Sequence, residues 1–401
     1  MKIQAMISSA EHPEYGAFPI SFPIPGGEYE NILGLLGPLG MGDAVLRDCY
    51  VEELAGNFPV LKRLEGSNVN VDELDYLAKR LDSFDAGEAA RFQAMAAKLE
   101  LHDMTDLINL TFRCGQATVI TDFSDLEAVG RGHFMNLNGG CATAEELEAL
   151  DGYETALLLI GSGAGTVTPY GVVYDNGMRL EQLYDGRHFP GYLYDDALLE
   201  LCVTSKYDDP DPEHPIVDYL YLPAPDSKIK RTLLRTGIGS PDGFNIFAVY
   251  TGLPTTVMDV LNSSRQDIYE LNNICQAIHD LGSGQMDKLS AAVLLAKPES
   301  AFEIGEIAKN LDLFDFVPGV KDAEEYGKYM IQQSGHFEYD PNLDNFYNYS
   351  QYGWERINRE QGQFTELGYI SYQGTMTMEE LLRGDPVERL EHEMDGMEGM
   401  S

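Results

Sequence analysis

The chain has 401 residues, and its 66 Asp and Glu against 27 Lys and Arg give a formal net charge of −39. An apolar content of 44% excludes an acidic disordered chain, and a chain of this length has room for about two to four domains. The charge argues against direct binding of nucleic acid or anionic lipid, because both need basic patches. If charge drives recognition, the partner should be basic.

Residues 1–65 are predicted to form a small α+β unit. Apolar runs bounded by Pro, Gly and polar residues predict strands, and one amphipathic run predicts a helix. The predicted strands are Ile3–Ser8, Phe18–Ile24, Asp48–Leu54 and Val60–Leu64, and the predicted helix is Tyr29–Leu36.

The next segment, residues 66–135, contains a sequence that the chain repeats. Glu73–Leu81 reappears as Glu270–Ile278, at an offset of 197 residues. The same offset places apolar residues on apolar residues, without a gap, over roughly 60 positions. Within each copy the apolar residues follow helical spacing, and carboxylates occupy the other faces. We therefore expect two acidic helical modules, at 66–135 and 267–335.

Residues 136–206 are predicted to form a β-rich block between the modules. It opens with a short acidic helix, Ala144–Leu150. Ala156–Ile160 followed by Gly161–Gly165 is similar to a strand entering a phosphate-binding loop, but the residues after it favour extended backbone. We interpret this stretch as a hairpin, and Asp175–Gly177 as a second hairpin signal.

The rest of the chain partly echoes its beginning. Proline and charge at 207–215 predict a linker, and 216–266 is expected to form a second small α+β unit before the second helical module. An aromatic and acidic segment follows at 336–376. The acidic tail, 377–401, is expected to be partly disordered.

Cysteine usage predicts a reducing compartment. The five cysteines lie far apart and form no C-x-x-C pair: Cys49, Cys114, Cys141, Cys202 and Cys275. This set favours neither a disulfide framework nor a zinc site. With no secretory signal or bilayer-spanning run recognised, we expect a cytoplasmic protein.

No catalytic, cofactor or metal motif is evident, so we expect a protein that is not an enzyme. The histidines form no H-E-x-x-H pattern, and no serine stands in a G-x-S-x-G context. The prolines of 207–215 disfavour calcium-loop geometry among the acids there. Asp185 and His188 are interpreted as a turn, and a hydrolase built on 136–206 would need a pocket with convergent acids near them.

Carboxylates recur along both predicted helical modules and beyond the second one. Acids three or four residues apart on a helix stand about 5–6 Å apart, which is similar in scale to the charge spacing of about 3.4 Å of axis along one DNA strand. Such an array favours imitation of a nucleic-acid duplex, although a solvated acidic face is the commoner reason for any single run. The carboxylates predicted to face a partner are Asp72, Glu73, Asp75, Asp82, Asp85, Glu88, Asp103, Asp106, Asp125, Glu127, Glu303, Glu306, Asp312, Asp315, Asp322, Glu324, Glu325, Asp344, Glu355 and Glu360.

Three stretches near the C-terminus resemble ArdA-type antirestriction proteins. They are Asp322–Tyr329 (DAEEYGKY), Asp344–Gly353 (DNFYNYSQYG) and Glu360–Ile370 (EQGQFTELGYI). The resemblance implies an elongated, acidic, dimeric DNA mimic, carried on mobile elements, that occupies the DNA groove of type I restriction–modification enzymes. This chain is longer than a typical member, and we identify no counterpart of 136–206 in that family.

The residues and the resemblance together predict an antirestriction protein that competes with DNA for a type I restriction–modification complex. It would bind neither nucleic acid nor membrane, and it could be a homodimer or replace a dimer by internal duplication. The alternative is an acidic interaction or scaffold protein of a mobile element that binds a different basic protein.

Overall fold

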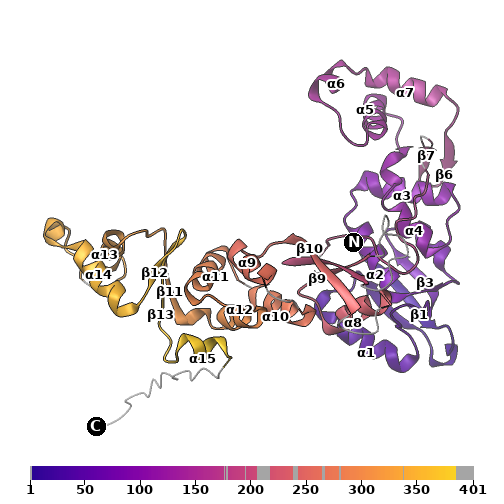
Figure 1. Ribbon diagram of the computed structural model, residues 1–401. Coiled ribbons are helices and arrows are strands. Elements are labelled where there is room, and N and C mark those ends of the chain that lie inside the picture. Colours follow the sequence, from indigo (N-terminus) through magenta and orange to yellow (C-terminus); the bar gives the residue numbers. More distant parts are fainter. Residues whose placement is uncertain are drawn as a thin grey trace, which may run out of the picture. The chain divides into compact units, whose positions relative to one another are not determined.

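The structure is a computed structural model of the chain (Figure 1). It describes residues 2–175, 177, 179–194, 196–205, 217–237, 243–263, 267–279, 281–336 and 338–384. The chain divides into two compact units. Unit 1 comprises Met1–Asp196, Leu201–Leu220 and Ala224–Ala248, and unit 2 comprises Ala197–Glu200, Tyr221–Pro223 and Val249–Ser401. Helices and small separate sheets are mixed along the chain, which confirms the predicted α+β class.

The first repeat begins with a four-stranded antiparallel sheet of order β2-β1-β3-β4. Its strands are β1 (Ile3–Ser9), β2 (Phe18–Phe22), β3 (Cys49–Gly56) and β4 (Asn68–Val69). The intervening helices are α1 (Tyr29–Leu36) and the 3₁₀-helices η1 (Pro13–Tyr15), η2 (Gly26–Glu28), η3 (Gly37–Leu39) and η4 (Pro59–Leu64). The first three predicted strands and the helix are confirmed.

The predicted strand Val60–Leu64 is wrong, because these residues form η4. Pro59 stands at the start of η4, where its fixed φ suits a helical turn. Val60, Leu61 and Leu64 are all buried, and that spacing fits a helical turn packed on the core better than the alternation of a strand.

The first repeat continues with helices and a second, three-stranded sheet of order β5-β7-β6. The helices are α2 (Val71–Asp82), α3 (Ala86–Lys98), α4 (Met104–Leu110), η5 (Cys114–Gln116), α5 (Leu126–Leu137), α6 (Ala144–Ala149) and α7 (Gly152–Gly161). The strands are β5 (Thr118–Ile120), β6 (Thr166–Thr168) and β7 (Gly171–Tyr174). Capping boxes Asn70–Glu73 and Asp85–Glu88 begin α2 and α3.

The strand expected at Ala156–Ile160 is wrong, because these residues lie in α7. The extended residues that follow do form a hairpin, in which β6 pairs with β7. Asp151 caps the helix by accepting a hydrogen bond from the backbone N–H of Glu154. Ala156 and Leu159 are buried whereas Leu158 is 71% exposed. This one-sided burial at a spacing of three residues is typical of a helix packed along one face.

The second repeat carries a similar series of elements, although its first sheet has three strands, in the order β10-β8-β9. Its strands are β8 (Leu199–Ser205), β9 (Val217–Leu222), β10 (Phe244–Thr251), β11 (Phe314–Pro318), β12 (Gln363–Phe364) and β13 (Gly368–Tyr372). Its helices are α8 (Asp226–Arg235), α9 (Thr255–Ser263), α10 (Ile268–His279), α11 (Ser283–Ala296), α12 (Ala301–Lys309), η7 (Leu311–Leu313), α13 (Ala323–Gln332), η8 (Pro341–Phe346), α14 (Tyr349–Glu360) and α15 (Met378–Leu382).

The duplication extends into residues that showed no repeat in the sequence. β5 and β7 pair Thr118 with Tyr174, and β11 and β13 pair Asp315 with Ser371, so both partners shift by 197 residues. The sheet orders β5-β7-β6 and β11-β13-β12 also correspond. Residues up to 174 therefore have a counterpart in the C-terminal part of the chain, and they belong to the first repeat.

Backbone details repeat at the same offset. The backbones of Glu100 and Lys297 both adopt the left-handed conformation, with φ of 52° and 53°. Few residues other than Gly adopt this conformation. The hydroxyl of Thr168 donates to the carbonyl of Gly171, and the hydroxyl of Thr365 donates to that of Gly368. Such local agreement indicates two copies of one fold rather than two similar compositions.

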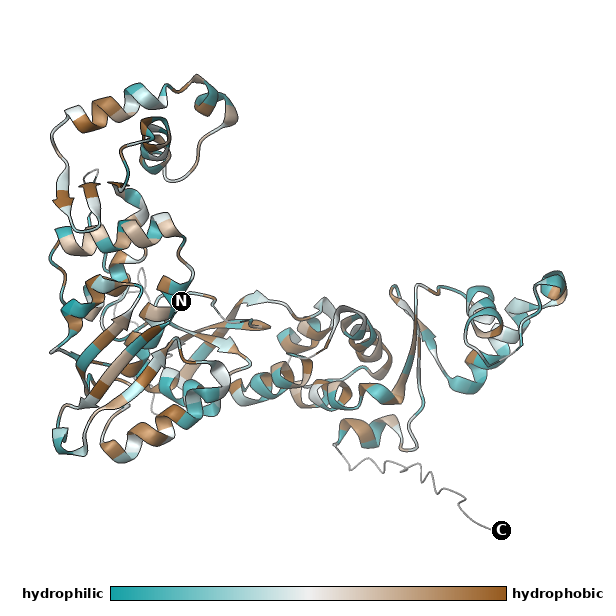
Figure 2. Cartoon of the chain, turned by 180° about the vertical axis from the view of Figure 1, so that it is seen from behind, coloured by the Kyte–Doolittle hydropathy of each residue, from teal (hydrophilic) through white to brown (hydrophobic). Residues whose placement is uncertain are grey.

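The largest core of unit 1 lies between the four-stranded sheet and α2 to α4. It contains alternating residues of β1 (Ile3, Ala5, Ile7) and residues of α2 at helical spacing (Leu74, Leu77, Leu81). In unit 2, Tyr326 and Tyr369 belong to a separate small core. In Figure 2, polar residues cover much of α13 and α14, whereas the strands of the first sheet are largely apolar. The predicted linker 207–215, Asn176 of the second hairpin signal and residues 385–401 of the tail lie outside the described residues.

Candidate functional site

Three carboxylates in the first half of helix α2 do not face solvent. Asp72, Glu73 and Asp75 are only 9%, 1% and 5% exposed. The prediction that these three contact a partner is therefore wrong, because side chains enclosed by their own protein cannot reach a second one. Burial of three ionisable groups on one helix requires compensating charges and hydrogen bonds.

Two arginines of α8 compensate the charge of Asp72. Arg231 Nε and Arg235 Nη1 lie 2.8 Å and 2.9 Å from Asp72 Oδ2, and the hydroxyl of Tyr29 donates to Oδ1 at 2.5 Å. Arg235 also donates to Asp218 at 3.0 Å. Burial alone would raise the pKa of Asp72, but Arg235 and Arg231 outweigh it and hold that pKa below its ordinary value.

Glu73 and Asp75 have separate partners. Arg47 lies 2.6 Å from Glu73 Oε1, and the hydroxyl of Tyr184 donates to the same oxygen at 3.0 Å. Lys79 lies 3.4 Å from Asp75. Burial raises the pKa of Asp75 despite the neighbouring Lys79. These contacts bind α2 into unit 1 and leave it no acidic face for a partner.

The other predicted carboxylates lie nearer the surface. Those that are half-buried are Asp82, Glu88, Asp106, Glu127, Glu303, Glu306, Asp344 and Glu360. Those that are exposed are Asp85, Asp103, Asp125, Asp312, Asp315, Asp322, Glu324, Glu325 and Glu355. Four of the exposed side chains, Asp85, Asp103, Asp125 and Asp322, also cap helices α3, α4, α5 and α13.

Many of the surface carboxylates lie on one substructure that each repeat contains. We call it the helix-pair module: residues 118–174 in the first repeat and 314–372 in the second. In each module a helix pair packs beside a three-stranded sheet, α5 with α7 and α13 with α14 (Figure 1).

Glycine allows each helix pair to pack closely. A Cβ added to Gly130 of α5 would overlap the carbonyl oxygen of Gly152, and one added to Gly327 of α13 would overlap that of Tyr349. The backbones therefore touch at equivalent places in the two repeats. Close packing of this kind sets the direction of the flanking acidic side chains, because neither helix can move far on the other.

The first helix-pair module is strongly acidic. It contains eight carboxylates and a single basic residue, Arg131, counting Lys and Arg. Arg131 lies 2.7 Å from Glu127, which is half-buried. The other seven carboxylates are exposed: Asp122, Asp125, Glu145, Glu146, Glu148, Asp151 and Glu154. The module therefore presents negative charge that its own cations do not offset.

The second helix-pair module is acidic but more balanced. It contains ten carboxylates and four Lys or Arg residues. Lys328 pairs with Glu324 at 2.7 Å, and Arg356 pairs with Glu360 at 2.5 Å. The hydroxyls of Tyr326 and Tyr369 also donate to Glu360. Glu360 is thus part of the internal packing of this module.

Sequence reasoning missed most of the acidic surface of the first module and part of that of the second. The missed exposed carboxylates are Asp122, Glu145, Glu146, Glu148, Asp151, Glu154, Glu338, Asp340 and Glu366. The predicted β-rich block concealed the repeat beyond residue 135. A signal was present in the matching pairs Thr168 with Gly171 and Thr365 with Gly368.

Asp185 and His188 form a turn, as predicted. Asp185 Oδ1 accepts hydrogen bonds from the backbone N–H groups of Arg187 and His188, and Oδ2 lies 2.7 Å from His188 Nδ1. His188 Nε2 lies 3.0 Å from the carbonyl oxygen of Arg235. Burial would raise the pKa of Asp185, but these hydrogen bonds hold it well below its ordinary value. Both imidazole nitrogens are engaged by the protein itself.

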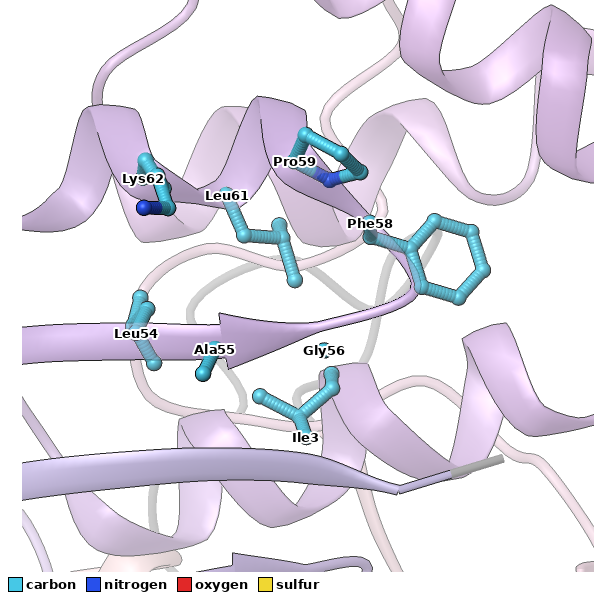
Figure 3. Close-up of a pocket in the computed structure, with 8 residues that line it drawn as sticks. All are labelled: Ile3, Leu54, Ala55, Gly56, Phe58, Pro59, Leu61 and Lys62. Atoms are coloured by element: carbon cyan, nitrogen blue, oxygen red, sulfur yellow. The ribbon is translucent and has the colours of Figure 1, made fainter.

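An apolar pocket lies where the ends of β1 and β3 meet η4 (Figure 3). Its lining residues are Ile3, Leu54, Ala55, Gly56, Phe58, Pro59, Leu61 and Lys62. In Figure 3 the side chain of Leu61, from η4, and that of Ile3, from β1, both point toward the end of β3. Lys62 is the only ionisable residue of the lining, which provides no carboxylate, imidazole, thiol or hydroxyl to act with its amine.

Comparison with known proteins identifies no relative. No model of a known protein family matches the chain. A search of curated proteins also gives no match. Among the described residues, no helix is long and apolar enough to cross a membrane, and no group of three or more His, Cys, Asp and Glu side chains is placed to hold a metal ion.

Proposed function

We propose that this protein is an antirestriction protein of the DNA-mimic class, which competes with DNA for the basic groove of a type I restriction–modification enzyme. The observation that supports it most is the helix-pair module of the first repeat, where seven of eight carboxylates are exposed and the single basic residue is paired. The C-terminal resemblance, within residues 322–370, falls in the equivalent module of the second repeat.

The mechanism is electrostatic competition. Lys and Arg residues that contact phosphates in the enzyme–DNA complex would contact Asp and Glu side chains in the inhibitor complex. Along α6, Glu145 and Glu148 are three residues apart, so their side chains are neighbours about 5–6 Å apart. Since these carboxylates are exposed, salt screens them, and binding should weaken as ionic strength rises.

The test is a competition between the purified full-length chain and a labelled duplex for the methyltransferase core of a type I enzyme. We expect the chain to displace the duplex at 50 mM salt. In a direct titration of the labelled chain with the same core, we expect binding to weaken as salt rises to 500 mM, where the Debye length falls to about 4 Å. Fluorescence anisotropy of the labelled duplex measures the displacement directly.

Two outcomes would contradict the proposal. The first is no displacement at low salt by the full-length chain. The second is equal displacement of the duplex from an unrelated DNA-binding protein, which would indicate general polyanion behaviour. Capture of a different basic protein without any restriction subunit would instead favour the alternative of an acidic interaction or scaffold protein.

A further inference from the structure

The second helix-pair module contains an open hollow of about 370 Å³ that the carboxylate array does not explain. Glu324 of α13 forms one part of its lining, and the residues around the start of α14 form the rest. The full lining is Glu324, Asn345, Phe346, Tyr347, Asn348, Tyr349 and Ser350. The lining residues therefore include a carboxylate, two primary amides and three aromatic side chains.

The aromatic part of the hollow is held in place by Asp344. The hydroxyls of Tyr339 and Tyr349 donate to Asp344 Oδ1 at 2.7 Å and 2.5 Å, and Gln332 Nε2 donates to the same oxygen at 2.9 Å. The ring of Tyr347 lies near those of both Tyr339 and Tyr349, with centroids 6.0 Å and 5.8 Å away. Three donors on one oxygen order this loop before any partner arrives.

Phe346 differs from these tyrosines because its side chain is almost fully exposed. It lines the hollow but is 83% exposed, the largest exposed fraction among the exposed large hydrophobic side chains of the described residues. A phenyl ring left so exposed adds little to the core, whereas burying it against a partner would remove a large apolar area from water.

The aromatic residues around the hollow have no aromatic counterparts at the same positions of the first repeat. The positions 197 residues before Tyr339, Phe346 and Tyr347 are Ala142, Ala149 and Leu150. Glu324 does have an acidic counterpart, Glu127. The repeats thus share the acidic helix, and the second repeat adds aromatic rings beside it.

A lysine of the protein itself already lies beside the carboxylate and one of the aromatic rings of this hollow. The ammonium group of Lys328 lies 2.7 Å from Glu324 Oε1 and 5.9 Å from the centre of the Tyr349 ring. A cation is therefore held between a carboxylate and an aromatic face at the edge of the hollow. A planar guanidinium suits such a place better than an ammonium, because it stacks on rings while donating several hydrogen bonds to carboxylate and amide oxygens.

We propose that this hollow receives an arginine side chain of the basic partner, with the guanidinium stacked on Phe346 or Tyr347 and paired with Glu324. The inference rests on the proposed function, since it names the side chain through which a basic groove would be anchored. Arginine and aromatic residues are the side chains most often found at the energetic centre of protein interfaces.

The experiment uses the full-length chain and two labelled peptides, six arginines and six lysines, in binding titrations at low salt. The test variants are the double substitution Phe346→Ala with Tyr347→Ala, and the single substitution Glu324→Gln. The matched controls are Phe123→Ala, an exposed phenylalanine of the first repeat, and Glu11→Gln, which removes one exposed charge outside both helix-pair modules. Circular dichroism confirms that each variant folds.

We expect the arginine peptide to bind more tightly than the lysine peptide. We also expect each test variant to weaken arginine binding by about fivefold. That is roughly 1 kcal/mol, the scale of one cation–π contact for the aromatic variant and of one exposed charge pair for Glu324→Gln. The controls should change binding less than twofold. Equal weakening by test and control variants would overturn the proposal, as would equal binding of the two peptides. Because no restriction enzyme is present, failure here is distinct from failure to displace DNA in the competition assay.

Discussion

At the scale of single residues, the buried ion cluster around Asp72 is the main departure from expectation. Arg231 and Arg235 come from α8, whereas Asp72 lies on α2. Breaking a buried ion pair by removing one partner is strongly destabilising, because it leaves charge enclosed without compensation. The cluster should therefore contribute to the stability of unit 1 and not to partner binding.

We predict that Asp72→Asn lowers the free energy of unfolding at pH 7 by about 3 kcal/mol. The substitution keeps the shape of the side chain but leaves two buried arginines without their shared carboxylate. Urea denaturation followed by circular dichroism measures the change. The matched control is Asp85→Asn, at an exposed cap of α3, where Asn caps as well as Asp and the change should be within about 0.5 kcal/mol.

The effect of Asp72→Asn should depend on pH. Because the native pKa of Asp72 lies below its ordinary 3.8, its charge stabilises the fold above that value, and this contribution is lost as pH falls through the native pKa. The difference between wild type and Asp72→Asn should thus be constant from pH 7 to about pH 5 and shrink below 3.8. Burial raises the pKa values of Asp75 and Asp218, so their contribution to the free energy of unfolding changes with pH in the opposite direction. Both residues are present in the wild type and in Asp72→Asn. A difference that stays constant down to pH 2 would contradict this account.

At the scale of elements, the helix-pair modules depend on glycine at the helix contact. Gly130 and Gly327 occupy equivalent positions, and a side chain on either would overlap a backbone carbonyl oxygen of the opposite helix. Backbone cannot move aside as a flexible side chain can. The contact therefore forces the helices apart when any side chain is added.

We predict that Gly130→Ala and Gly327→Ala each destabilise their module by about 2 kcal/mol, as overpacked cores do. The control is Gly132→Ala, also in α5, where the added methyl group meets no atom within 4 Å. At this position the better helix propensity of Ala should stabilise the module by up to about 1 kcal/mol. Hydrogen exchange of α5 and α7 reports the first module. Equal exchange in Gly130→Ala and Gly132→Ala would show that the close contact does not matter.

At the scale of the whole molecule, the chain is a duplication in which the two copies have diverged in charge. The first helix-pair module keeps one basic residue, whereas the second has four. If carboxylates substitute for phosphates, the first module should contribute more to the electrostatic part of binding. The second would contribute more through its aromatic hollow.

We predict that replacing Glu145, Glu146, Glu148 and Glu154 together by Gln raises the concentration needed to displace duplex from a type I methyltransferase core by roughly tenfold. The estimate takes a little under a twofold change in affinity for each exposed charge pair. The control replaces Glu11, Glu14, Glu28 and Glu53, which are exposed in the first α+β unit and give the same change in net charge. Equal effects of the two sets would show that total charge, and not its placement, governs competition.

The local sequence pattern predicts several elements correctly. It is wrong where one pattern fits two kinds of secondary structure. Helix Tyr29–Leu36 has the bounds that its amphipathic run predicts. The Glu73–Leu81 repeat correctly indicated α2 and α10. Ala156–Ile160 was misassigned because a short apolar run suits a buried strand and a helix equally well. The decisive features are the cap at Asp151 and the packing on α5.

Taken by itself, the amino-acid sequence determined the charge of this protein, its mixed helix and strand content and the duplication of its helices, because composition and periodicity are local properties. Only the tertiary structure decided which carboxylates reach solvent. Asp72 lies 159 residues before Arg231 in the chain, and no local pattern reveals that they meet. The tertiary structure likewise revealed the second half of each repeat, since strand register and helix contacts persist after side chains have diverged.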